Sequence, residues 1–268
     1  MNSSKKSSRR DFLRSASAAL GWGVWAATAP GQAFAQNPPT RPPAVKPVVG
    51  SQLYAWGQYD ERAGKNLNAH LDEVLAAIRD CGYEYAEGWL DAAQPENNAR
   101  FAEQLRAKGL KPVSLYTGGR LHEQGAAEAT VQRLLAAAGV CQKAGFQVLN
   151  CNPDPIGREK TDAELAVQAA ALTRLGTGLN QLGLRLGVHN HTPEMKNHAR
   201  EFHFNFDHTE PAIVGFCFDV HWVDRGGIAP LTALAEYGNR VVSWHLRQSR
   251  NGIWWEDLDT GDIDYSVV

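Results

Sequence analysis

The chain of 268 residues lacks several familiar signatures, and each absence excludes a class of protein. No glycine-rich phosphate loop is present, because the first expected strand leads into the segment from Tyr54 to Gln58, which disfavours a dinucleotide-binding sheet. There is no clear basic cluster for phosphate or nucleic acid. No apolar run reaches the ~20 residues of a membrane-spanning helix. The composition, 43% hydrophobic and 21% charged, instead indicates a globular chain long enough for one large domain.

The four cysteines include no C-x-x-C pair. Each lies inside or at the edge of an apolar segment, which favours buried free thiols. A disulfide between Cys141 and Cys151 stays open, because an oxidising compartment would permit one. The four positions are Cys81, Cys141, Cys151 and Cys217.

The first 35 residues have the form of a removable export signal. The pair Arg9-Arg10 lies in a charged segment, an apolar stretch covers residues 16–29, and Ala33-Phe34-Ala35 provides a cleavage site. We therefore expect recognition by the twin-arginine export machinery, cleavage near Ala35, and a periplasmic protein with no stable membrane anchor. Residues 36–47 are interpreted as a proline-rich linker, and residues 48–268 as the folded domain.

Charge restricts the partners. Removal of the signal would leave 22 Lys and Arg against 28 Asp and Glu, a net charge of −6. An acidic domain argues against nucleic acid or an anionic membrane as a partner. The expected partner is a small molecule that is neutral or held by a metal. A homo-oligomer remains open.

A glycine followed by a large apolar residue recurs along the rest of the chain. This pair ends four helical stretches, at spacings of 27, 36 and 38 residues: Gly82, Gly109, Gly145 and Gly183. These spacings match βα units, which require parallel strands. Strands are expected at residues 48–54, 83–88, 111–116, 146–150, 184–190, 214–219 and 241–246. Their alternation with helices predicts a (β/α)8 TIM barrel, with an open doubly wound sheet as the alternative.

The barrel is expected to be incomplete in this chain. Helices are predicted at 66–80, at 162–182 after a Thr161–Glu164 capping box, and at 229–237, while 201–209 is ambiguous. After the seventh strand we expect a loop over 247–261 and the beginning of a helix over 262–268. The eighth strand and its helix have no counterpart, which we interpret as the sign of a fragment, because an open barrel would expose two strand edges.

Polar side chains stand where the expected strands end, which is the functional face of such a barrel. Strand alternation predicts that His189 and His191 share a face, and likewise Asp219 and His221. Together with His245, these groups predict one convergent metal site of imidazoles and carboxylates without a thiolate. Such a donor set suits Mn, Mg, Co or Zn. We predict Asp219, His245, His191 and His189 as the metal ligands.

Other polar and aromatic residues around the same face are candidates for catalysis and substrate binding. Glu194, three residues beyond His191, could ligate, act as a base or bind a sugar hydroxyl, and Glu87 ends the second strand. The predicted catalytic residues are Glu194, Glu87 and His221. Aromatic rings beside strand ends could form a wall against a sugar, although core packing explains them equally well. The predicted substrate-binding residues are Tyr116, Asn150, Asn190, Trp56 and Trp222.

Four segments resemble the sugar phosphate isomerase/epimerase family, whose members have a xylose isomerase-like barrel: residues 188–194, 218–221, 245–247 and 257–264. The resemblance implies a divalent metal held by Glu, Asp, His and Glu from strands five to eight. Asp219 and His245 match the second and third ligands. Gly187 stands about where many members have the first glutamate, so His189, His191 or Glu194 would have to substitute for it.

The activity that the resemblance implies is a metal-dependent isomerase or epimerase of a sugar or keto-sugar. It would transfer a proton next to a carbonyl through a metal-bound enediolate. Two alternatives remain open. One is a lyase, dehydratase or oxidised-glycoside-cleaving enzyme on the same scaffold, and the other is a non-catalytic carbohydrate-binding protein.

Overall fold

The computed structural model describes residues 46–255 and 257–268. The export signal and almost all of the linker lie outside the described residues, so both interpretations remain predictions. The domain is built on a parallel sheet of seven strands, each beside its neighbour in sequence. The strands are β1 (Gly50–Gln52), β2 (Tyr85–Trp89), β3 (Ser114–Gly119), β4 (Val148–Pro153), β5 (Arg185–His189), β6 (Gly215–Asp219) and β7 (Val241–His245).

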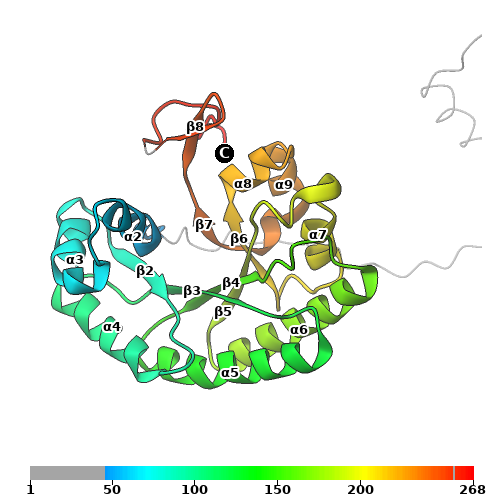
Figure 1. Cartoon of the computed structure of the whole chain (residues 1–268), viewed down its shortest axis with the longest axis horizontal. Helices are drawn as coiled ribbons and strands as arrows, with labels where there is room; N and C mark the ends of the chain where they lie inside the picture. Colours follow the sequence, from blue (N-terminus) through cyan, green and yellow to red (C-terminus); the bar gives the residue numbers. More distant parts are fainter. Residues whose placement is uncertain (1–45, 256) are drawn as a thin grey trace, which may run out of the picture. The chain divides into compact units, whose positions relative to one another are not determined.

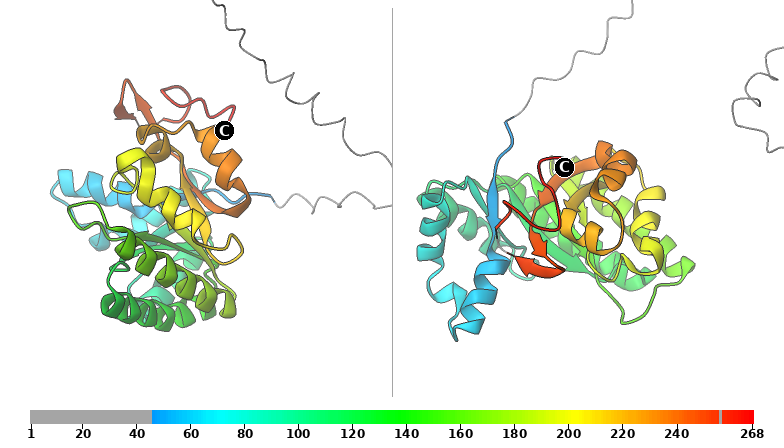
Figure 2. Two further views of the ribbon diagram at one scale, coloured as in Figure 1. Left: turned by 90° about the vertical axis from the view of Figure 1, so that its right-hand side faces the viewer. Right: turned by 90° about the horizontal axis from the view of Figure 1, so that it is seen from above.

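Helices follow the strands, and several of them cover the outer side of the curled sheet (Figure 1). They are α2 (Leu53–Arg62), α3 (Leu71–Asp80), α4 (Glu96–Ala107), α5 (Gln124–Lys143), α6 (Asp162–Gln181), α7 (Lys196–Asp207), α8 (Val220–Arg225) and α9 (Pro230–Tyr237). Figure 2 shows the same arrangement from two further sides. The predicted TIM-barrel class, with seven parallel strands in the described part of the chain, is confirmed.

The recurring glycines have the left-handed backbone conformation that was predicted for the ends of the helices. Gly82, Gly109, Gly145 and Gly183 all have positive φ, between 77° and 96°, which a side chain would resist. Each lies just after a helix and turns the chain back towards the sheet. The capping box of α6 is also confirmed, with Thr161 and Glu164 each bonding the backbone of the other.

Strand alternation divides the core from the site. On β6, Phe216 points outwards, where its ring packs 5.6 Å from Phe202 and 4.8 Å from Phe206 of α7. Cys217, the next residue, points the other way and contacts His189 of β5. The outer face is therefore a packed aromatic core, and the inner face carries the polar groups.

Three local expectations are wrong. β1 ends at Gln52 and α2 begins at Leu53, so Trp56 lies in a helix. The expected loop over 247–261 contains an antiparallel hairpin, β8 (Gln248–Arg250) and β9 (Ile253–Trp255), joined by Asn251 and Gly252. Both turn residues have positive φ, as this kind of hairpin turn requires.

The third wrong expectation is the helix after residue 262, where the described chain forms turns. Asp262 accepts hydrogen bonds from the Ser249 hydroxyl and from the Asn251 and Gly252 amides of the hairpin, so the segment is tied to the hairpin.

The cysteines are free, as predicted. Cys141, Cys151 and Cys217 are buried, whereas Cys81 is exposed after α3, which corrects the expectation that all four are buried. Within the described residues, no helix is long and apolar enough to cross a membrane.

Candidate active site

A buried ion pair joins the second and seventh strands. His245 Nε2 lies 3.0 Å from Glu87 Oε1, and both side chains are more than nine-tenths buried. Gln52 of β1 donates to the same oxygen at 2.6 Å, and Ser114 and Asn150 donate to the other at 2.6 and 2.7 Å. Side chains from four strands therefore contact the Glu87 carboxylate. Gln52 of β1 also lies 3.1 Å from His245 Nε2 of β7, so the two strands meet through these side chains.

This arrangement fixes the charges of the pair. Burial alone would raise the pKa of Glu87, but the charge of His245 and the hydrogen bonds from His245, Ser114 and Gln52 lower it to about 2. Burial opposes protonation of His245, yet the neighbouring Cys217 and Glu87 raise its pKa well above the usual value. Glu87 is therefore a permanent acceptor, which orients the His245 ring.

Asn150 fills the space that a glutamate at position 187 would need. Its amide oxygen accepts from the Ser243 hydroxyl at 2.7 Å, while its nitrogen is bound to Glu87. A Cβ added to Gly187 would overlap the Asn150 oxygen and lie 3.1 Å from Cys217 Cβ. The glycine therefore belongs to the packing that supports Glu87.

We expect that Gly187→Glu destabilises the protein by about 1–3 kcal/mol, because the new side chain must displace Asn150. It should add no metal ligand. Urea unfolding and metal stoichiometry test this, with Gly57→Ala as the control, because a Cβ at Gly57 has its nearest neighbour at an ordinary 3.8 Å. A Gly187→Glu protein of unchanged stability that binds metal more tightly would contradict the expectation.

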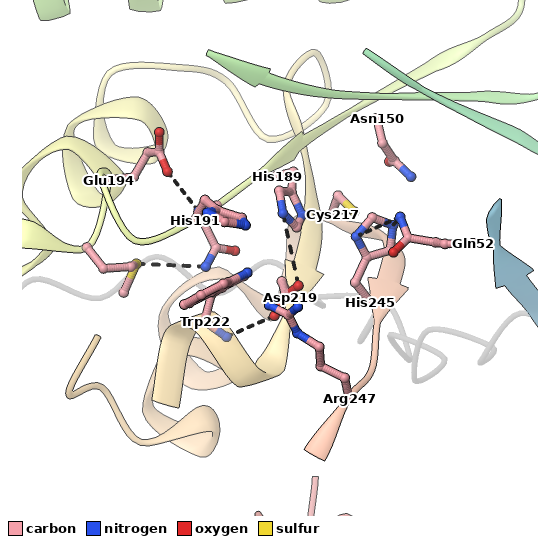
Figure 3. Close-up of polar contacts among 12 residues, drawn as sticks. Gln52, Asn150, His189, His191, Glu194, Cys217, Asp219, Trp222, His245 and Arg247 are labelled. Atoms are coloured by element: carbon pink, nitrogen blue, oxygen red, sulfur yellow. Dashed lines mark hydrogen bonds and ion pairs between the residues drawn. The ribbon is translucent and has the colours of Figure 1, made fainter. Parts of the chain in front are cut away.

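A second group of polar side chains lies beside His245 (Figure 3). His189 of β5 has its Nδ1 3.9 Å from Cys217 Sγ and its Nε2 4.0 Å from Asp219 Oδ2. The rings of His189 and His245 are 4.9 Å apart. One ligand atom each from His189, Cys217 and His245 lie within 4.8 Å of one another.

Burial dominates the electrostatics of this group. It lowers the pKa of His189, which the neighbouring charge of His245 lowers further. It raises the pKa values of Cys217 and of Asp219. The charged forms of these three residues are therefore poorly solvated by water.

Asp219 has two roles at the end of β6. Its Oδ1 accepts from the Trp222 amide at 2.8 Å and so caps α8, and its Oδ2 faces His189. Because α8 begins at Val220, strand alternation does not extend to His221, and the expected shared face of Asp219 and His221 is wrong for that reason. β5 ends at His189, before His191, yet the two rings lie with their centroids 5.9 Å apart.

His191 and Glu194 form a short loop beside the cluster. Glu194 Oε2 accepts from the His191 amide at 2.7 Å, and its Oε1 is buried without a hydrogen-bond partner among the described residues. Burial, with the nearby Glu201 charge, raises the pKa of Glu194 to about 7. The His191 ring packs 4.2 Å from Trp222, and burial and Arg247 lower its pKa to about 4.

A cation stacked between tryptophans lies over the end of β6. The Arg247 guanidinium is 4.6 Å from the Trp222 ring and 4.1 Å from Trp254 of the hairpin. Both ring nitrogens of the buried His221 lack a hydrogen-bond partner among the described residues. Burial, followed by Arg247, lowers the pKa of His221 to about 4, so this ring is neutral at pH 7.

The predicted substrate-binding residues have different positions. Tyr116 packs against both histidines, with ring centroids 5.3 Å from His189 and 6.1 Å from His245. The Asn190 amide nitrogen lies 3.8 Å from the Met195 sulfur. Trp56 donates its indole N–H to Ser51 at 3.1 Å and packs against the core.

Sequence reasoning missed Ser114, Ser243, Cys217, Gln52 and Arg247 of this site. Cys217 lies two residues before Asp219 on β6, so strand alternation alone places both side chains on the inner face and could have predicted Cys217 as a site residue. Gln52 ends β1, and its contact with His245 spans 193 positions, for which the sequence has no local signal. Arg247 lies two residues beyond His245, and its place depends on the hairpin that carries Trp254.

The donor atoms fit a divalent metal. The imidazoles of His189 and His245 converge with the thiol of Cys217. Asp219 lies beside His189, and Glu87 lies beside His245. Nitrogen and sulfur donors together suit a borderline ion such as zinc or cobalt.

Comparisons with known proteins agree with this fold. The chain is 24% identical over 222 residues to an inosose dehydratase of Geobacillus kaustophilus (strain HTA426), covering 76% of this chain and 70% of that protein. A sugar phosphate isomerase/epimerase from Parabacteroides distasonis ATCC 8503 superposes with a TM-score of 0.67 at 18% identity, covering 84% and 82% of the two chains. The zinc-bound IolI protein superposes with a TM-score of 0.59 at 14% identity, covering 77% and 75%.

Residues 75–267 match a sequence family over most of the domain. This range includes β2 to β7, which carry the cluster of histidines, cysteine and carboxylates. Gln52 of β1 lies before it. The chain therefore belongs to the xylose isomerase-like TIM barrel family.

Proposed function

We propose that this protein is a divalent-metal-dependent isomerase or epimerase that moves a proton at the carbon next to a sugar carbonyl. The observation that carries the proposal is the convergence of His189, Cys217 and His245 within 4.8 Å at the carboxyl ends of neighbouring strands. Two carboxylates, Asp219 and Glu87, stand beside the two rings. The likeness to a sugar phosphate isomerase/epimerase and to the zinc-bound IolI protein supports the same reading.

A divalent ion at this cluster would polarise the carbonyl and make the adjacent C–H bond more acidic. His189 and His245 would hold it, together with a residue of β6. Glu87 keeps the His245 ring in one orientation, and Asp219 faces His189 from the other side. The half-buried Tyr116 ring, which lies against both histidines, would close one side of the sugar site.

Glu194 is the better of the two candidate glutamates for proton transfer. Four donors surround Glu87, and its pKa of about 2 makes it a poor base. Glu194 has an unpartnered Oε1 within the described residues and a pKa of about 7, close to the value at which a carboxyl both takes up and releases a proton. The neutral His221 could accept a hydrogen bond from a sugar hydroxyl.

A dehydratase is the second candidate, because the curated relative is an inosose dehydratase. Both activities begin by removing a proton next to a carbonyl. They differ in the fate of the substituent on the following carbon, which an epimerase keeps and a dehydratase expels. The product distinguishes them, since dehydration lowers its mass by one water.

Metal removal provides the test. In D2O with a panel of sugars and keto-sugars, the metal-loaded protein should incorporate deuterium at one carbon, and chelator-treated protein should lose this exchange almost completely until a divalent metal is restored. Proton NMR and mass spectrometry follow the exchange. If metal-loaded protein exchanges no C–H proton, the proposal is wrong. Sugar affinity that is unchanged by the chelator would then favour the non-catalytic binding protein.

A further inference from the structure

Cys217 occupies the centre of the cluster. It is fully buried in β6, where it pairs with His189 of β5 on one side and with Ser243 of β7 on the other. Its Sγ is 3.9 Å from His189 Nδ1. In a tetrahedral zinc site with Zn–S of about 2.3 Å and Zn–N of about 2.0–2.1 Å, the sulfur and nitrogen would be about 3.6 Å apart. The observed distance is therefore close to that of two ligands on one ion.

Each histidine has one nitrogen beside a carboxylate. Glu87 lies 3.0 Å from His245 Nε2, and Asp219 lies 4.0 Å from His189 Nε2. Because a carboxylate only accepts hydrogen bonds, His245 carries a proton on the Nε2 that contacts Glu87. In His189 the nitrogen that faces Cys217 is Nδ1. Carboxylate partners orient metal-bound histidines in this way.

We propose that Cys217 is a thiolate ligand and that His189, Cys217 and His245 form an N2S site for zinc or cobalt, with an open position for the substrate. Asp219 and Glu87 are then positioning residues, which orient the rings. This inference rests on the proposed metal-dependent function and specifies its metal, because a thiolate favours zinc over manganese or magnesium. The arrangement differs from the Glu, Asp, His and Glu set that the sequence resemblance implies.

Cobalt provides a direct readout of the thiolate. The experiment uses the whole chain in a Cys81→Ser background, because Cys81 is exposed and would bind metal adventitiously. Chelator-treated protein is titrated with Co2+, and the near-ultraviolet thiolate-to-cobalt charge-transfer band is recorded. Zn2+ and Mn2+ affinities are then measured by competition. The variants are Cys217→Ser, Cys217→Ala and the control Cys151→Ala, which removes an equally buried thiol from β4, two strands away in the same sheet.

The parent and Cys151→Ala should show the band at one cobalt per chain. Both Cys217 variants should lose it, and their zinc affinity should fall by at least about 10–100-fold, the range for altering a metal site even outside its direct ligands. Cys217→Ser keeps the size of the side chain, so a folded protein is retained if Cys217→Ala is unstable.

The outcomes separate this inference from the proposed function. Cobalt bound without the band, with equal zinc affinity in the parent and Cys217→Ser, would overturn the thiolate ligand and leave the metal-dependent function standing. A parent chain that binds no metal would overturn both. A charge-transfer band in a protein that exchanges no sugar C–H proton would support the N2S site and overturn the proposed function.

Discussion

Replacing His245 by alanine is expected to abolish metal-dependent proton exchange, with a loss of at least about a thousandfold. His245 is one of the three converging donors, so its removal leaves two. A metal contributes several kcal/mol to the stabilisation of such a transition state, and each 1.36 kcal/mol is tenfold in rate. Deuterium incorporation into the sugar and metal content by elemental analysis should therefore fall together.

Two comparisons make the His245 result specific. His208→Ala removes an exposed histidine after α7 and should leave metal content and exchange unchanged. His245→Asn can retain a hydrogen bond to Glu87, which separates loss of the ligand from loss of the buried pair. Should His245→Ala keep one metal per chain and full exchange, His245 is not a ligand and the site must be assigned elsewhere.

Replacing Glu87 by alanine is expected to lower the free energy of unfolding of the chelator-treated protein by about 3–5 kcal/mol, because one partner of a buried ion pair is lost. The donors of Gln52, Ser114 and Asn150 would also lose their acceptor. Urea unfolding followed by circular dichroism measures the change.

A control and a double variant test the reason for the Glu87 effect. Glu84→Ala breaks the more exposed pair with Lys111 and should cost at most about 1 kcal/mol. Glu87→Ala with His245→Ala removes both buried charges, so the double variant should be more stable than the sum of the single changes implies. Strict additivity would show that the pair is not coupled.

The Glu87 pair also explains why the site tolerates Gly187. A carboxylate reaches His245 from the second strand, and Asn150 fills the inner side of the fifth. Residues 87 and 187 are 100 positions apart, so no local sequence pattern links Gly187 to Glu87.

The sequence by itself determined the architecture. Glycine and a large apolar residue mark the ends of helices locally, and the βα spacing leaves little choice beyond parallel strands, so seven strands and the barrel class were predictable. The strand ends at His189, Asp219 and His245 were predictable for the same reason. The hairpin was missed although Asn251-Gly252 is a strong turn signal, because neither short flanking segment shows a clear strand pattern.

Only the tertiary structure decided which polar groups meet. Asp219 and His221 are two positions apart, yet a helix begins between them and separates their roles. Cys217 looks like a core residue in sequence and becomes a candidate ligand only because strands five, six and seven bring His189 and His245 to it. Side-chain contacts across 158 and 193 positions, from Glu87 and Gln52 to His245, depend on how the sheet curls. Local pattern fixes the period and direction of each strand, whereas the distances between strands depend on the packing of the whole sheet.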